Sequence, residues 1–146
     1  MKIIVLLGRF LFSFIFILSG VHHFSGGTVA YAANQGVPYA SFLVPASGIL
    51  AMLGGLSILF GFRARVGAWM LVLFLIPVTF VMHNWWDVTD PMLRQMQMAN
   101  FNKNMALLGG ALIVAYYGSG AWSIDKMLHP HKGSRKLQQP HKLQHI

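Results

Sequence analysis

Four long apolar segments constrain this chain more than any other feature of its sequence. They occupy residues 3–24, 42–62, 66–82 and 104–118. A helix needs roughly 20 apolar residues to cross a hydrocarbon layer about 30 Å thick, and lipid offers no partner for an unpaired backbone amide. Only 10% of the residues are charged, against about 25% in soluble domains. We therefore predict an all-α membrane protein in which residues 1–125 form a bundle of four transmembrane helices.

The basic residues are distributed unevenly between the two sides of this topology. Arg94 and Lys103 fall on one side, and the other side carries Lys2, Arg9, Arg63, Arg65, Lys126 and the cations that follow. By the positive-inside rule, we predict that both termini face the cytoplasm from a bacterial inner (plasma) membrane. Residues 126–146 are then a basic cytoplasmic tail, which we expect to be disordered. Because orientation accounts for the net charge of +8, we predict no nucleic-acid partner.

A helix start is predicted in the third connection between the apolar segments. Asp90 precedes Pro91, and Asp accepts hydrogen bonds from the free amides of a first helical turn, where Pro is tolerated. We predict a short amphipathic helix over residues 91–99 on the outer membrane surface. The first connection, residues 25–39, is uncharged and is predicted to lie on the same side.

Two of the apolar segments share a pattern. The sequences LAMLGGLSILFGF (residues 50–62) and MALLGGALIVAYYG (residues 105–118) align Gly54 and Gly55 with Gly109 and Gly110. Both segments run in the same direction in the predicted topology. The pattern is explained either by a parallel duplication of two helices or by chance similarity between apolar helices. Since small residues let membrane helices approach closely, we place these four glycines at helix contacts.

The order of several short motifs resembles that of the DoxX family of small four-helix inner-membrane proteins. The motifs are GRF at 8–10, SGVHHF at 19–24, GVP at 36–38, GGLSILFGFRAR at 54–65, His83, NFNKNMALLGG at 100–110 and GSGAWSID at 118–125. The resemblance implies an association with membrane oxidoreductases, such as thiosulfate:quinone oxidoreductase, or with oxidative-stress complexes. Two positions depart from the family, because Ala51 stands where Glu is often found and His23 where Lys is common. A mechanism that needs a buried carboxylate in the second helix is therefore not implied.

Arg9 lies about two helical turns into the first apolar segment. A charge inside a membrane segment is a candidate functional group, although a long Arg side chain is able to reach the interface. Asp125 belongs to the same rim in the predicted topology. We predict a structural Arg9–Asp125 ion pair, with extension of Arg9 to the interface as the alternative.

Polar and aromatic residues gather at the outer ends of the predicted helices. The residues that we select as candidate ligand-binding groups are His23, His83, Trp85, Lys103 and Asn104. His and Lys donate hydrogen bonds that suit the carbonyls of a quinone head group, and Trp offers an aromatic wall. The competing interpretation is an interfacial aromatic belt with capping asparagines. No metal site is predicted, because no carboxylate or cysteine completes a ligand set with the histidines.

The sequence contains no nucleophile–base pair, carboxylate dyad, phosphate loop or dinucleotide fingerprint. With the family resemblance, this favours an accessory, non-catalytic subunit of a membrane redox complex. Quinone is the one candidate cofactor, and the predicted partners are redox proteins in the same bilayer. The alternative is a non-redox membrane module for assembly, lipid binding or small-molecule transport. The glycine faces leave a homo-oligomer open as well.

Overall fold

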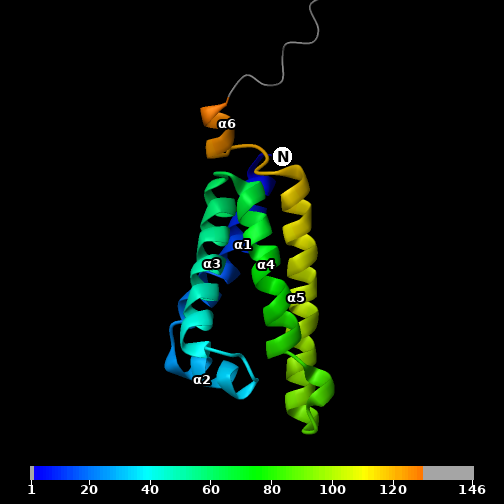
Figure 1. Ribbon diagram of the computed structural model, residues 1–146. Coiled ribbons are helices and arrows are strands. Elements are labelled where there is room, and N and C mark those ends of the chain that lie inside the picture. Colours follow the sequence, from blue (N-terminus) through cyan, green and yellow to red (C-terminus); the bar gives the residue numbers. More distant parts are fainter. Residues whose placement is uncertain (1, 130–146) are drawn as a thin grey trace, which may run out of the picture.

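The computed structural model describes residues 2–129, and these residues form helices and connecting turns only. The long helices α1, α3, α4 and α5 lie side by side (Figure 1). In chain order the elements are α1 (Lys2–His22), α2 (Gly26–Asn34), α3 (Ala40–Phe60), α4 (Ala64–Met82), the 3-10 helix η1 (Trp85–Asp87), α5 (Pro91–Tyr117) and α6 (Ile124–Leu128). Most of the tail predicted over residues 126–146 lies outside the described residues.

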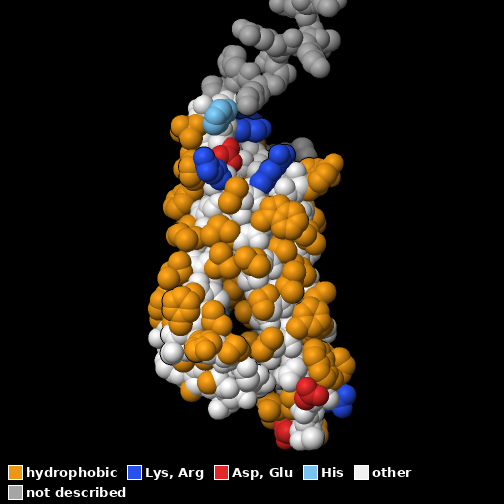
Figure 2. Space-filling view, in the orientation of Figure 1, with side chains coloured by type: hydrophobic (Ala, Val, Ile, Leu, Met, Phe, Trp, Pro, Cys, Tyr) orange, Lys and Arg blue, Asp and Glu red, His pale blue; other side chains and the backbone are white. Residues whose placement is uncertain are grey.

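Three segments are long and apolar enough to cross a membrane, namely Lys2–His22, Ala40–Phe60 and Ala64–Asp87. The helix α5 adds a fourth long element of 27 residues. On the face seen in Figure 2, hydrophobic side chains cover the middle of the molecule and charged side chains gather at its two ends. This distribution suits a protein whose sides contact lipid. The predicted all-α membrane fold is confirmed.

The two ends of the bundle differ in what they carry. The amino terminus, the turn between α3 and α4, and α6 lie at one end, which we call the α6 end (Figure 1). The other end carries α2, η1 and the start of α5, and we call it the α2 end. The helices α3 and α5 both run from the α2 end to the α6 end, which is the direction that the predicted repeat requires.

Neighbouring helices approach most closely at two reciprocal glycine pairs. A Cβ added to Gly54 in α3 would lie 2.9 Å from the carbonyl oxygen of Gly67 in α4, and the converse distance is also 2.9 Å. Gly20 in α1 and Gly48 in α3 are related in the same way, at 2.6 and 2.7 Å. These distances leave no room for a side chain, so the backbones themselves are in contact. The helix α3 is thus held directly between α1 and α4.

The remaining predicted packing glycines do not share one environment. Gly55 faces α1, where an added Cβ would lie 3.2 Å from the carbonyl oxygen of Ser13, and Gly110 faces the ring of Phe12 at 2.7 Å. Gly109 departs from the expectation, since an added Cβ would meet nothing within 4 Å. The helix α3 has long neighbours on two sides, whereas α5 packs mainly on α4. One residue of the second glycine pair therefore faces outward.

The apolar core lies where α1, α3 and α4 meet. Its largest fully buried side chains are Phe16, Ile58, Leu71 and Leu75, and α5 adds Ala111. Toward the α2 end, beyond the contact of Gly54 with Gly67, α3 and α4 diverge (Figure 1). The site described below lies toward this end, between α1, α4 and α5.

The helix α5 begins as predicted but continues further. The Asp90 carboxylate accepts a hydrogen bond of 2.7 Å from the amide nitrogen of Leu93. The prediction of a short separate helix over residues 91–99 is wrong, because one helix runs from Pro91 to Tyr117. No Gly or Pro interrupts residues 92–108, so nothing in the sequence ends the helix there. Its 27 residues span about 40 Å, so α5 exceeds the thickness of the hydrocarbon layer.

The first connection contains a helix that the sequence analysis did not predict. The hydroxyl of Ser25 caps α2 by accepting a hydrogen bond of 3.3 Å from the amide nitrogen of Thr28. Ala32 is fully buried and belongs to a small apolar cluster with Val44 of α3. Through this contact α2 lies against α3 and closes the bundle at the α2 end.

Candidate ligand-binding site

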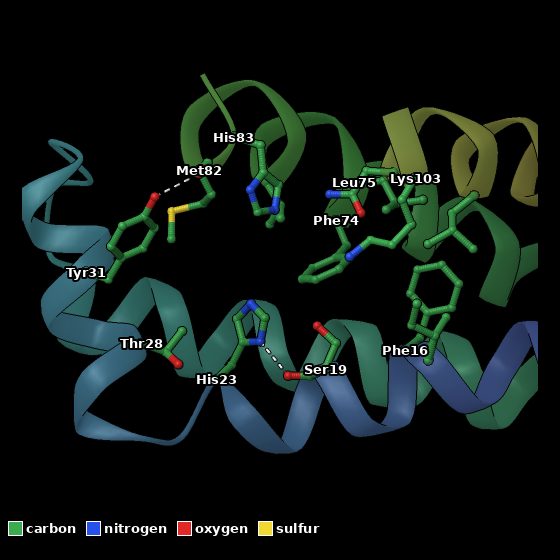
Figure 3. Close-up of a pocket in the computed structure, with 14 residues that line it drawn as sticks. Phe16, Ser19, His23, Thr28, Tyr31, Phe74, Leu75, Met82, His83 and Lys103 are labelled. Carbon is green, nitrogen blue, oxygen red and sulfur yellow. Dashed lines mark hydrogen bonds between the residues drawn. The ribbon is translucent and has the colours of Figure 1, made fainter. Parts of the chain in front are cut away.

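A cavity of about 260 Å³ lies toward the α2 end, between α1, α4 and α5, with α2 beside it. Phe16 and Phe74 form part of its apolar wall, with ring centroids 6.4 Å apart in an edge-on arrangement. The polar side chains that line it include Ser19, His23, Tyr31, His83, Lys103 and Asn104. Figure 3 shows His23, His83 and Lys103 directed into this space from different elements.

The structure therefore brings four of the five predicted ligand-binding residues around one cavity. His23 follows α1 directly, His83 follows α4 directly, and Lys103 and Asn104 lie in α5. These residues are distant in sequence, and the packing of α4 against both α3 and α5 brings their elements together. The site is thus built from the ends of α1 and α4 and the middle of α5.

The orientation of His83 is set by a chain of three hydrogen bonds. The hydroxyl of Tyr31 donates to the backbone carbonyl of Met82 at 3.2 Å, so it accepts from the amide nitrogen of Gln97 at 2.9 Å. The amide oxygen of Gln97 then faces His83, at 2.7 Å from Nδ1. Because an amide oxygen only accepts hydrogen bonds, Nδ1 carries the proton. The Nε2 atom of the neutral ring is left as an acceptor.

The ring of His23 is held in the same tautomer by a different contact. Its Nδ1 atom lies 2.6 Å from the backbone carbonyl oxygen of Ser19, which only accepts hydrogen bonds. The ring also packs against the edge of Phe74, with centroids 5.4 Å apart. In the neutral form of the ring, Nε2 is therefore an acceptor here as well. Two imidazoles with the same proton arrangement face one cavity (Figure 3).

The helix α5 supplies the hydrogen-bond donors. Lys103 is the one Lys or Arg among the described residues that line the cavity, and its Nζ atom donates to the side-chain oxygen of Asn100 at 3.2 Å. Asn104 lines the cavity and is only 6% exposed. The buried residues of α5 are Gln97, Asn104 and Ala111, which are spaced by seven and so lie on one helix face. This face carries the polar groups toward the cavity.

The cavity combines two acceptor nitrogens, an ammonium group and an amide with aromatic and aliphatic walls. Such a combination suits a small ring compound that carries oxygen atoms at its edge. Within residues 2–129, no group of three or more His, Asp, Glu or Cys side chains is placed to hold a metal ion.

Known proteins share this sequence organisation. The DoxX family model matches residues 4–84, which span α1 to α4. The inner membrane protein YqjF of Escherichia coli (strain K12) is 35% identical over 128 residues, covering 86% of this chain and 92% of YqjF. The chain belongs to the DoxX family. The resemblance predicted from its motifs is confirmed.

A second relative of this DoxX protein is the inner membrane protein YphA of the same organism. It is 29% identical over 126 residues, which cover 85% of this chain and 89% of YphA. No solved structure matches the chain. The names of both relatives and the long apolar helices agree that this DoxX protein is a multi-pass protein of the inner membrane.

Trp85 is the predicted ligand-binding residue that does not line the cavity of this DoxX protein. It belongs to η1, which follows His83 and leaves the bundle. The ring of Trp85 lies 5.9 Å from that of Trp86, and the guanidinium carbon of Arg94 lies 5.5 Å from its centroid. Trp85 therefore packs against a cation and a second indole outside the cavity.

At the α6 end, Arg9 and Asp125 bind backbone groups instead of each other. The Nη1 and Nη2 atoms of Arg9 donate to the carbonyl oxygens of Ser119 and Trp122, at 3.2 and 2.6 Å. The carboxylate of Asp125 accepts a hydrogen bond of 2.9 Å from the amide nitrogen of Arg63. The turn before α6 needs donors for its carbonyl groups, and Arg9 supplies them. This arrangement takes the place of the predicted ion pair, and Arg9 is buried rather than extended to the surface.

Among the polar residues of the site that were not selected from the sequence, Gln97 and Tyr31 orient other side chains. Gln97 orients His83, and its position seven residues before Asn104 is a signal that places both on one helix face. Tyr31 orients Gln97 from α2. Its role depends on where α2 packs, so no local pattern in the sequence indicates it.

Proposed function

We propose that this DoxX-family protein binds a quinone or a similar lipid-soluble ring compound in the cavity between α1, α4 and α5. The proposal rests on one observation, the pair of imidazoles that border the cavity. The Nδ1 atoms of His23 and His83 are both held by oxygen acceptors, so both rings have Nε2 available for a ligand.

The polar groups of the cavity suit both redox forms of such a ligand. A hydroquinone carries hydroxyl groups, which donate hydrogen bonds to the neutral imidazoles of His23 and His83. A quinone carries carbonyl groups, which accept hydrogen bonds from the ammonium of Lys103 and the amide of Asn104. All four residues line the same cavity. Each redox form of the ligand therefore finds hydrogen-bonding partners in the cavity.

The position of the cavity favours a ligand that arrives from the bilayer. Two of the helices that form its walls, α1 and α4, are long and apolar enough to span the membrane, and its apolar lining includes Phe16, Phe74 and Leu107. A lipid-soluble ring reaches such a site without crossing water. We extend the proposal to an accessory role in a membrane redox complex on the basis of the family resemblance set out above.

We also infer that the α6 end faces the cytoplasm. Lys2, Arg63, Arg65 and Lys126 belong to elements at this end, whereas Arg94 and Lys103 belong to the part of α5 nearer the other end. Cytoplasmic connections of inner-membrane proteins carry an excess of Lys and Arg. This orientation places the ligand cavity in the half of the bundle farther from the cytoplasm.

The experiment is a binding measurement on the purified full chain in lipid nanodiscs. The probe is the benzoquinone 2,3-dimethoxy-5-methyl-6-decyl-1,4-benzoquinone in its oxidised and reduced forms, and the bound fraction is quantified by native mass spectrometry. We expect the His23→Ala variant to weaken binding of the reduced form about tenfold, which corresponds to about 1.4 kcal/mol. We expect Lys103→Met to weaken binding of the oxidised form by a similar factor.

The matched control is His22→Ala. The Nδ1 atom of His22 also contacts a backbone carbonyl, that of Leu18 at 2.8 Å, but His22 is exposed and does not line the cavity. Its variant is expected to bind like the unmodified chain. Failure of the unmodified chain to bind either form contradicts the proposal. Retention of a phospholipid or a copurifying protein in that case favours the alternative, a module for lipid binding or assembly.

A further inference from the structure

A second cavity adjoins the first inside the bundle. It has a volume of about 350 Å³ and lies between α2, α3 and α4. Four residues line both cavities, namely His23, Thr28, Val78 and Met82. The two spaces are therefore separated only by a shared wall of side chains.

The second cavity is far more apolar than the first. Its lining includes Leu43 and Val44 from α3 and Pro77 and Val81 from α4. It lies where α3 and α4 diverge beyond their glycine contact (Figure 1), and Figure 2 shows a hollow between these helices that hydrophobic side chains border. Both helices that border this hollow are long and apolar enough to cross a membrane.

The volume of the first cavity limits what it holds. Pockets that enclose a whole drug-sized ligand measure about 300–1,000 Å³, and the polar cavity, at about 260 Å³, lies below that range. It accommodates a single ring with its oxygen substituents. A long substituent on that ring needs another path, and the apolar cavity beyond the shared wall supplies one.

The shared wall contains a side chain that is able to move aside. Met82 lines both cavities, and Figure 3 shows its side chain beside Tyr31. Met is unbranched and has three rotatable bonds, so it adapts to a neighbouring group at low cost. The hydrogen bond at this residue involves its backbone carbonyl and the hydroxyl of Tyr31, which leaves the side chain free to change rotamer.

We infer that the ligand is an amphiphile with one polar ring and one apolar chain. The ring occupies the polar cavity, and the chain passes Met82 into the apolar cavity and leaves between α3 and α4 into the bilayer. This inference rests on the proposed function and adds to it the class of substituent, its path and the side of the bundle on which it leaves.

The test measures the effect of the ligand's apolar chain separately from the effect of its ring. Lipid solvates the apolar chain of a ligand as well as the cavity does, so the length of this chain alone is not expected to change the affinity for the protein. A bulky side chain that blocks the path of the apolar chain is expected to lower it. The first probe is the decyl-substituted benzoquinone, and the second is the same ring without the chain, 2,3-dimethoxy-5-methyl-1,4-benzoquinone. The blocking variant is Ser47→Phe, which places a ring at a position of α3 that lines the apolar cavity.

We expect Ser47→Phe to weaken binding of the decyl probe at least tenfold and to leave binding of the ring probe within twofold of the unmodified chain. Ile49→Phe is the matched control, because Ile49 lies on the same helix, is 46% exposed and lines neither cavity. It is expected to change neither probe. If Ser47→Phe does not fold, Val81→Trp fills the same cavity from α4.

The outcomes distinguish this inference from the proposed function. If the unmodified chain binds neither probe, the proposed function fails and this inference fails with it. If the unmodified chain binds both probes and the blocking variants weaken both equally or neither, the inference alone is overturned. Selective loss of the decyl probe supports the path between α3 and α4.

Discussion

The Nη2 atom of Arg9 donates a hydrogen bond of 2.6 Å to the carbonyl oxygen of Trp122, 113 residues further along the chain. Trp122 has a positive φ of 54°, an uncommon backbone conformation for a residue other than glycine. The bond joins the first membrane helix to the turn that precedes α6. Arg9 is only 6% exposed, so this contact is a buried connection between the two ends of the described chain.

Removing this connection is expected to destabilise the bundle. Hydrogen bonds from charged groups contribute about 1.5–3 kcal/mol each, and Arg9→Met removes the bonds to Ser119 and Trp122. For two such bonds we expect a loss of about 3–6 kcal/mol in the free energy of unfolding, measured by reversible denaturant unfolding in detergent micelles. Lys126→Met is the control, because Lys126 is exposed at the same end. Equal stability of the two variants contradicts the role assigned to Arg9.

The glycine contacts give a second prediction. An added methyl group at Gly54 meets the backbone of Gly67, whereas one at Gly109 meets nothing within 4 Å. We expect Gly54→Ala to lower the free energy of unfolding by about 1–3 kcal/mol through overpacking. Gly109→Ala is expected to be neutral or to stabilise the helix by up to about 1 kcal/mol, since Ala has the higher helix propensity. The midpoints of thermal unfolding in the same detergent compare the two variants, and a reversed order refutes the packing described here.

The membrane orientation gives a third prediction. The chain contains no cysteine, so single-cysteine variants report on one position at a time. We expect Arg94→Cys to react with a membrane-impermeant maleimide in intact spheroplasts, and Lys126→Cys to react only after the membrane is permeabilised. Both positions are exposed in the structure, so burial in the protein does not explain a difference between them. The opposite labelling pattern contradicts cytoplasmic termini.

The membrane fold was predictable because apolar length is a local property of the sequence. The start of α5 at Asp90 and Pro91 was predictable for the same reason, since a cap involves only neighbouring residues. The polarity of residues 100–104 predicts a boundary near Ala99, but no Gly or Pro breaks the helix there, so α5 continues to Tyr117. The sequence also does not predict which residue Gly54 contacts, because that contact depends on which helices become neighbours.

The candidate site was predictable in part. His23, His83, Lys103 and Asn104 are polar residues at or near the ends of apolar segments, and the topology brings these ends together. Trp85 shares that position in the sequence, but η1 carries it away from the cavity. The tautomers of the two histidines depend on individual oxygen acceptors, which only the folded structure specifies.

The hydrogen bond between His83 and Gln97 gives the last prediction. The amide oxygen of Gln97 lies 2.7 Å from Nδ1 of His83 and fixes the tautomer of the neutral ring, in which Nε2 accepts a hydrogen bond from a ligand hydroxyl. Gln97→Leu removes this acceptor, and the ring of His83 loses its fixed tautomer and orientation. We expect binding of the reduced decyl benzoquinone to weaken about tenfold, or about 1.4 kcal/mol. Because Gln97 acts through His83, it is a positioning residue.

Two further variants separate positioning from a general structural effect. Gln97→Glu keeps an oxygen acceptor for Nδ1 of His83, but a carboxylate at this position favours the imidazolium, whose Nε2 donates a hydrogen bond instead of accepting one. It is therefore expected to weaken binding of the reduced probe about tenfold, or about 1.4 kcal/mol, and to retain binding of the oxidised probe. Gln95→Leu introduces the same apolar side chain at an exposed position of α5 and is expected to leave binding unchanged. Dissociation constants from native mass spectrometry compare all four proteins. If Gln97→Leu binds the reduced probe as tightly as Gln95→Leu does, His83 does not depend on Gln97 to present Nε2.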